Sequence, residues 1–165
     1  METHLRYRQS ETGIAFCCWV IYELKQEDAS VYFLEFNEGR IGELNKAHVE
    51  LDPNPFELKK MEREIIEEYP IESLPLKEHE ISIELKNGPW HPERIKEIER
   101  KLLRSIEWNF IHTGLGFKDP AYHWSFNRFV LSVRLIPNPK IKALLKEDFS
   151  HWIPSASIKV SEGIY

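Results

Sequence analysis

Apolar and polar residues alternate with two different periods along this chain, and the period distinguishes strands from helices. The run Ile14–Tyr22 is apolar on both parities and rich in β-branched and aromatic residues, which predicts a strand covered on both faces. Val31–Phe36 predicts a second strand, Asn37–Arg40 a turn, and residues 40–44 a short third strand. The first part of the chain therefore predicts an antiparallel meander.

Three later segments repeat apolar residues at steps of three and four, the period of an amphipathic helix. They lie at about 54–69, 92–112 and 139–149. Asn54 is a suitable N-cap for the first helix, and Pro92 is a suitable first residue for the second. The sequence thus predicts two main helices and a short third one.

Two further segments have period 2, which predicts strands, and one more strand is expected near the end of the sequence. His79–Lys86 alternates cleanly, which predicts a strand with one wet face. Tyr122–Ile136 alternates but changes phase near Asn127 and Arg128, which predicts a bulge or break there. A last strand is expected at Ser155–Val160.

This order of elements predicts an α+β fold. We expect a mostly antiparallel or mixed sheet of about five to six strands, with the helices packed on one face of it. A length of 165 residues matches the usual size of one domain, so a single domain over 1–165 is expected. The order of the strands does not follow from the sequence.

Charge is unevenly distributed along the chain. The net charge is −5, with 15 Lys and Arg against 23 Asp and Glu in residues 1–110, and 7 against 4 in residues 111–165. No dense Lys/Arg cluster is present, so nucleic acid is not an expected partner. The acidic part suits a basic protein partner, and it equally serves solubility.

The two cysteines, Cys17 and Cys18, are adjacent and have no other partner in the chain, which indicates a reducing compartment. Residues 1–12 contain no apolar signal core, and the longest apolar run is too short to span a bilayer. A cytoplasmic location without membrane association is therefore expected.

Established motifs for enzymes, metals and nucleotides do not match. His123 and Ser125 have the histidine–x–hydroxyl spacing of two-histidine phosphoesterases, but that chemistry needs a second such tripeptide, which is missing. The zinc and calcium ligand spacings, the phosphate-binding loop and the dinucleotide fingerprint are also missing. No cofactor and no metal are expected. Cys17 and Cys18 lie within the most apolar predicted strand, so their thiols are not expected to act as nucleophiles.

The densest group of aromatic and polar residues follows the second helix. As candidate binding residues we select Trp108, His112, Tyr122, His123, Trp124, Asn127 and Arg128. Tryptophan and histidine are adjacent three times, as Trp90–His91, His123–Trp124 and His151–Trp152. Such pairs place a large amphipathic ring beside a switchable donor, which is typical of binding surfaces and also compatible with a structural role.

Two functions remain open. The first is a non-enzymatic protein-interaction module that binds a macromolecule through this Trp/His surface, for example a neutraliser of a basic protein; homo-oligomerisation is a related possibility. The second is a small-ligand-binding protein or hydrolase-type enzyme with a cleft near residues 112–128. In the second, His112, His123 and Asp119 would be the catalytic groups, and Arg128 would hold an anion.

Overall fold

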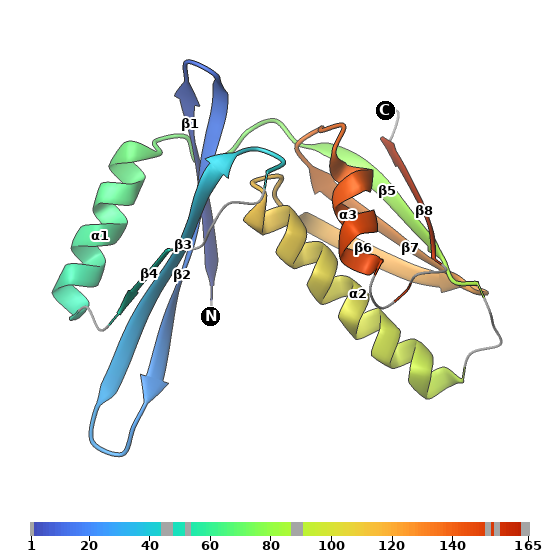
Figure 1. Ribbon diagram of the computed structural model, residues 1–165, viewed down its shortest axis with the longest axis horizontal. Helices are drawn as coiled ribbons and strands as arrows, with labels where there is room; N and C mark the ends of the chain where they lie inside the picture. The colour runs from blue at the N-terminus through green and yellow to red at the C-terminus, as the bar shows by residue number, and fades with distance from the viewer. Residues whose placement is uncertain are drawn as a thin grey trace. The chain divides into compact units, whose positions relative to one another are not determined.

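The computed structural model describes residues 2–43, the backbone of 48–51, and residues 54–86, 91–150, 153 and 156–162. Contacts divide the chain into two compact units, Met1–Leu74 with His112–Gly114, and Pro75–Ile111 with Leu115–Tyr165. Each unit contains one four-stranded antiparallel sheet (Figure 1). The single domain expected over 1–165 stays a prediction, because two compact units of one chain can still unfold together.

The first unit is a meander followed by a helix. Its strands pair in sequence order, each antiparallel to the next: β1 (Thr3–Ser10), β2 (Gly13–Lys25), β3 (Ser30–Arg40) and β4 (His48–Leu51). Strand β1 is absent from the elements expected from the sequence because its residues are mostly polar. It forms through pairing, since all eight of its residues lie opposite a residue of β2.

Helix α1 (Pro55–Glu68) covers one face of the first sheet. Its start is fixed by a capping box, in which Asn54 accepts from the Glu57 N–H and the Glu57 carboxylate accepts from the Asn54 N–H. Leu58 of the helix and Tyr69, the residue that follows it in sequence, pack with residues of β2 and β3 in one apolar cluster: Ala15, Cys17, Trp19 and Leu34.

The second unit has the order β5 (Lys77–Glu84), α2 (Pro92–His112), β6 (Lys118–Ser125), β7 (Arg128–Leu135), α3 (Ile141–Phe149) and β8 (Ser157–Glu162). Its sheet has the strand order β6-β7-β5-β8, and every neighbouring pair is antiparallel. Strand β7 therefore lies between β5 and β6, and β5 lies between β7 and β8. This is the ferredoxin-like, or split β-α-β, arrangement.

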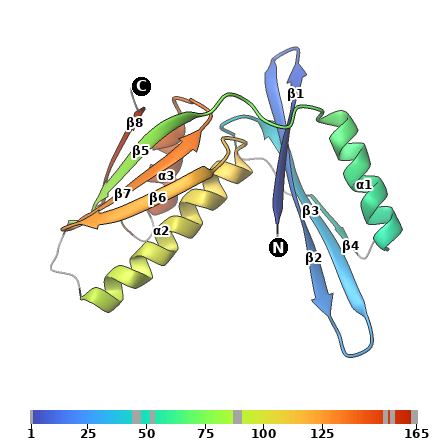
Figure 2. The same ribbon diagram turned by 180° about the vertical axis from the view of Figure 1, so that it is seen from behind.

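Both helices of the second unit cover the same face of its sheet, as the two opposite views show (Figures 1 and 2). The covered face is apolar, with Ile81 and Ile83 of β5 opposite Leu131 and Phe129 of β7. From α2, Ile98, Leu102, Ile106 and Phe110 are buried, and from α3, Ile141, Leu145 and Phe149.

The α+β class, the antiparallel pairing and the three helices agree with the sequence prediction. The strand count and the sheet do not: among the described residues eight strands form two sheets, where one sheet of five to six strands was expected. The apolar period of a strand shows that it has a buried face, but it does not show which sheet it joins.

Two local predictions are also wrong. Asn37–Arg40, expected as a turn, is the end of the long strand β3, and the turn lies at Ile41 and Gly42. The predicted strand 40–44 falls on this turn and partly outside the described residues. The break predicted near Asn127 and Arg128 is confirmed, because a two-residue turn, Phe126–Asn127, separates strands β6 and β7 there.

Candidate functional site

Glutamate 99 of α2 holds two aromatic side chains of β6. The hydroxyl of Tyr122 donates to one carboxylate oxygen of Glu99 at 3.1 Å, and the indole N–H of Trp124 donates to the other at 2.7 Å. Both rings also contact Phe129 of β7, at centroid distances of 5.5 and 5.3 Å. Alternate residues of a strand share a face, so these two side chains lie on the helix-covered side of the sheet.

These two rings are fixed in place, yet they remain open to solvent. Tyr122 is 45% exposed, and Trp124 is partly exposed. Strand β6 lies at the end of the strand order, so no strand of the described chain pairs with its outer side. Fixed aromatic side chains on an uncovered edge form a surface that loses little conformational freedom when it is bound.

His123 and Arg128 lie on the opposite, helix-free face of the same sheet. His123 faces Val130, and Ser125 faces Arg128, in the register of β6 with β7. Arg128 forms an ion pair with Glu84 of β5 at 3.6 Å. This face is polar, with acidic residues on β5 beside basic residues on β7, and it bears no aromatic side chain on either central strand.

The turn between β6 and β7 carries the most exposed aromatic residue in the described part of the chain. Phe126 is 96% exposed and has a φ of 58°. Bulky residues rarely adopt this left-handed conformation, which is most often occupied by glycine. The neighbouring Asn127 fixes the turn, because its side chain donates to the Leu85 carbonyl at 2.8 Å and its own carbonyl accepts from the Leu85 N–H at 2.9 Å.

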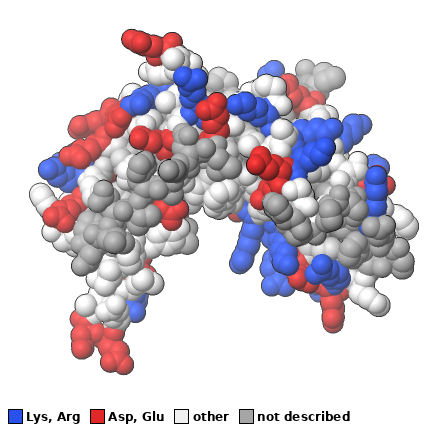
Figure 3. Space-filling view, viewed as in Figure 1, with Lys and Arg blue, Asp and Glu red and all other residues white. Residues whose placement is uncertain are grey.

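Trp108 lies elsewhere in the second unit. It is 50% exposed on α2 and lines an open depression of about 550 Å³ with Lys101, Arg104, Ser105 and Asp148. Basic side chains gather over the helices of this unit on the face drawn in Figure 3. Lys101 is engaged with Glu97 at 3.0 Å. The depression is shallow, and its walls come from α2 and α3 alone.

His112, the last residue of α2, belongs to the first unit. Its Nδ1 atom lies 2.6 Å from the Asn37 amide nitrogen and 3.9 Å from the Cys18 sulfur. Burial lowers the pKa of His112, and burial raises the pKa of Cys18 to about 11. The imidazole is therefore neutral and the thiol protonated at neutral pH, so this pair is not an activated nucleophile.

Asp119 makes its own contact, an ion pair with Arg134 at 3.5 Å, and its φ of 52° accompanies an irregularity of register in β6. The candidate residues thus fall into separate groups. Tyr122 and Trp124 share one face of β6, and His123 shares the other face with Arg128. The remaining pairs, Trp90–His91 and His151–Trp152, include residues outside the described part of the chain.

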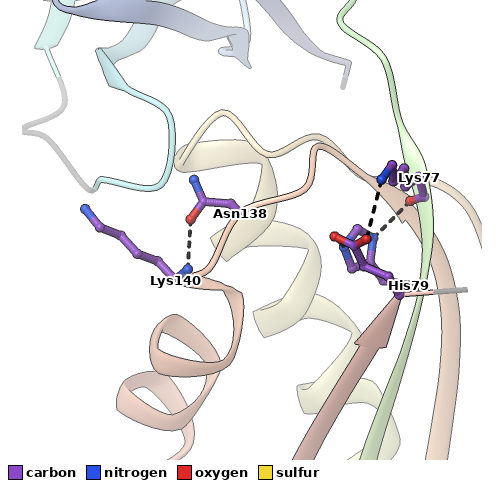
Figure 4. Close-up of polar contacts among 5 residues, drawn as sticks. Lys77, His79, Asn138 and Lys140 are labelled. Carbon is purple, nitrogen blue, oxygen red and sulfur yellow. Dashed lines mark hydrogen bonds and ion pairs between the residues drawn. The ribbon is translucent and has the colours of Figure 1, made fainter.

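A buried histidine, His79, was not among the candidate site residues selected from the sequence. His79 of β5 is 2% exposed, its Nδ1 lies 2.9 Å from the Lys77 carbonyl, and its Nε2 lies 3.7 Å from the Glu162 carboxylate (Figure 4). Lys77 also pairs with Glu162, at 3.6 Å. These contacts fasten the end of β8 to β5. The same figure shows Asn138, whose side chain accepts from the Lys140 N–H ahead of α3.

Neither a metal centre nor a membrane helix is found in the part of the chain that the structure describes. No three side chains among its His, Cys, Asp and Glu residues gather as a set of ligands. No described helix combines the length and apolarity needed to cross a bilayer. No protein-family description, curated protein or solved structure matches the chain.

Proposed function

We propose that this chain is a non-enzymatic protein-interaction module, and that it binds a protein partner along strand β6 and the aromatic residues beside it. The observation that carries this proposal is the pair Tyr122 and Trp124, held by the Glu99 carboxylate on an edge strand whose outer side pairs with no strand of the described residues. Trp and Tyr, together with Arg, are the residues enriched at the hot spots of protein interfaces. An open edge also offers backbone groups to an extended segment of another protein.

Regular pairing, which binding along the edge requires, is present in only part of β6. Proline 120 and the irregular register between Lys118 and Ala121 interrupt the first half of β6. Pro and irregular pairing are features that protect an edge from association. The regular half, Ala121–Ser125, has neither feature, and the aromatic residues lie in this half.

Affinity capture with matched variants tests the proposal. The tagged full chain is incubated with an extract of the cells that produce it, in parallel with Tyr122→Pro and Tyr122→Thr. Both variants lose the ring and the bond to Glu99, but only proline removes the backbone N–H. We expect the wild type to retain a protein that Tyr122→Pro loses and Tyr122→Thr keeps at a reduced level.

Circular dichroism and thermal melting serve as the control for folding in the same three proteins. A partner lost only from the proline variant, with its melting temperature unchanged relative to Tyr122→Thr, supports recognition through the edge. Equal retention by all three proteins would show that β6 is not the binding surface.

A further inference from the structure

We infer that the partner of β6 is a second copy of this chain, paired antiparallel in a register centred on His123. This inference rests on the proposed function, since it names the partner of the same strand. The β6-β7-β5-β8 sheet of one copy and the same sheet of the other copy would then form one sheet of eight strands around a twofold axis. In such a dimer the same surface serves both copies.

The backbone of β6 determines which groups point outward. The turn Phe126–Asn127 has two residues, so the flanking pair Ser125 and Arg128 is the hydrogen-bonded pair that closes the hairpin. Hydrogen-bonded and non-bonded positions alternate in an antiparallel pair. The N–H and C=O groups of Tyr122 and Trp124 therefore point away from β7, toward the free edge.

Self-pairing in the register centred on His123 uses these outward groups completely. It places Tyr122 of one copy opposite Trp124 of the other, and the reverse, which gives four backbone hydrogen bonds. A shift that places Tyr122 opposite itself would leave Trp124 opposite Pro120, which has no N–H to donate. The strand is thus self-complementary in the first register and deficient in the second.

Side chains agree with the same register. The Tyr122 and Trp124 rings of opposite copies become cross-strand neighbours on the helix-covered face, a favourable aromatic pair. Phe126, 96% exposed in the single chain, comes opposite Pro120 of the second copy. The segment Ala121–Phe126 contains no Asp, Glu, Lys or Arg, so two copies meet there without repulsion between like formal charges.

A disulfide tests the register directly. His123 would face its own symmetry mate as a non-hydrogen-bonded pair, with a Cα separation of about 4.5 Å, which is within disulfide range. Ser125 would lie four residues from its mate along the strand, about 13 Å away and out of reach. His123→Cys and Ser125→Cys are therefore matched variants on one face of one strand.

Both variants are incubated with oxidised glutathione and run on non-reducing gels. The native thiols do not interfere, because Cys17 and Cys18 are each 1% exposed. We expect a covalent dimer of two 19.6 kDa chains for His123→Cys and none for Ser125→Cys. No dimer from His123→Cys, or equal dimer from both, would overturn the inference.

Sedimentation of the wild type, Tyr122→Pro and Tyr122→Thr measures the association itself. Each proline removes one N–H per copy and so two hydrogen bonds per dimer. We expect the dissociation constant of the proline variant to exceed that of the threonine variant by about tenfold or more. The interface of one short strand pair is small, so the measurement should extend to about 500 µM protein.

The two proposals fail in different ways. A wild type that stays monomeric throughout overturns self-pairing, while loss of a captured partner from Tyr122→Pro would still support the proposed function. A dimer that forms equally in all three proteins, together with unchanged capture, overturns both at this strand.

Discussion

The two sheets of this protein treat their outermost strands differently. On the outer side of β1, Tyr7 exchanges both backbone hydrogen bonds with Ile71, at 2.8 and 2.9 Å. The Arg6 guanidinium donates to the carbonyls of Tyr69 and Pro70, each at 3.0 Å, and holds that segment in place. Strand β6 has no equivalent cover among the described residues, and it carries exposed aromatic side chains instead.

This difference suggests how to distinguish structural edges from binding edges. An uncovered strand is prone to associate, and proteins usually blunt it with charge, proline or a covering segment. The chain covers β1 with its own residues after α1. It blunts only the first half of β6, and the second half is where Tyr122 and Trp124 are held in place. The unprotected half of β6 therefore has the features expected of a binding edge.

The largest effect on stability is expected at Gly114, which contacts the first sheet. Gly114 has a φ of 74°, and its carbonyl accepts a hydrogen bond from the Tyr7 hydroxyl at 2.9 Å. A Cβ added at Gly114 would lie 2.5 Å from the Phe16 ring. Gly114→Ala should lower the free energy of unfolding by about 2–4 kcal/mol, through overpacking and backbone strain. Chemical denaturation measures this loss.

Gly13→Ala is the matched control. Gly13 also has a positive φ, 129°, but an added Cβ there meets nothing within 4 Å. Its cost should be limited to backbone strain, about 1–2 kcal/mol. Equal losses from both substitutions would show that contact with Phe16 is unimportant.

A smaller effect is expected from opening the covered edge. Arg6→Met removes two charge-assisted hydrogen bonds to the segment over β1, and should cost about 1–2 kcal/mol of unfolding free energy. Arg8→Met, on the same strand, removes the exposed ion pair with Glu68 and the contact of the guanidinium with the Tyr69 ring at 4.7 Å, and should cost about 1 kcal/mol or less. If Arg8→Met destabilised the protein more than Arg6→Met, the two hydrogen bonds of Arg6 would not be what holds the covering segment in place.

The same unit should also respond to pH through His112. Burial lowers the pKa of this imidazole in the folded chain, so the unfolded chain binds the proton more readily. Its contribution to stability is present above the unfolded pKa of about 6.5 and is lost as the pH falls below it. Between about pH 7.5 and 5, the wild type should lose more unfolding free energy than His112→Gln does. Parallel curves for the two proteins would contradict this.

The smallest effect on stability is expected at the tip of the open edge. Phe126 holds a positive φ with a fully exposed ring, so Phe126→Gly relieves strain, whereas Phe126→Ala removes the ring and keeps the strain. The glycine variant should be more stable than the alanine variant by up to about 1 kcal/mol in thermal melts. Both should associate more weakly than the wild type if the ring contributes to an interface.

Local elements were predictable from the sequence where their periods were strong. The helices expected at 54–69, 92–112 and 139–149 occur at Pro55–Glu68, Pro92–His112 and Ile141–Phe149. Caps and apolar stripes involve residues only a few positions apart, so they can be read along the chain. Strand β1 was missed because its mostly polar residues are ordered by pairing with β2.

The candidate surface was predictable in composition but not in geometry. Tyr122, His123, Trp124 and Arg128 are neighbours in sequence, yet the pleat of β6 and the turn after it divide them between two faces. Glu99 was missed, because it lies 23 and 25 residues before the rings that it holds. Phe126 was missed as well, since its exposure depends on the hairpin that displays it.

The amino-acid sequence by itself determined which segments are helical or extended, and which aromatic residues stand together, because both depend on interactions over a few residues. The tertiary structure decided that the strands form two sheets, which edge is covered, and which side of β6 each ring faces. Those outcomes depend on pairing between distant segments, as when Ile71 covers Tyr7 and Glu99 holds Trp124.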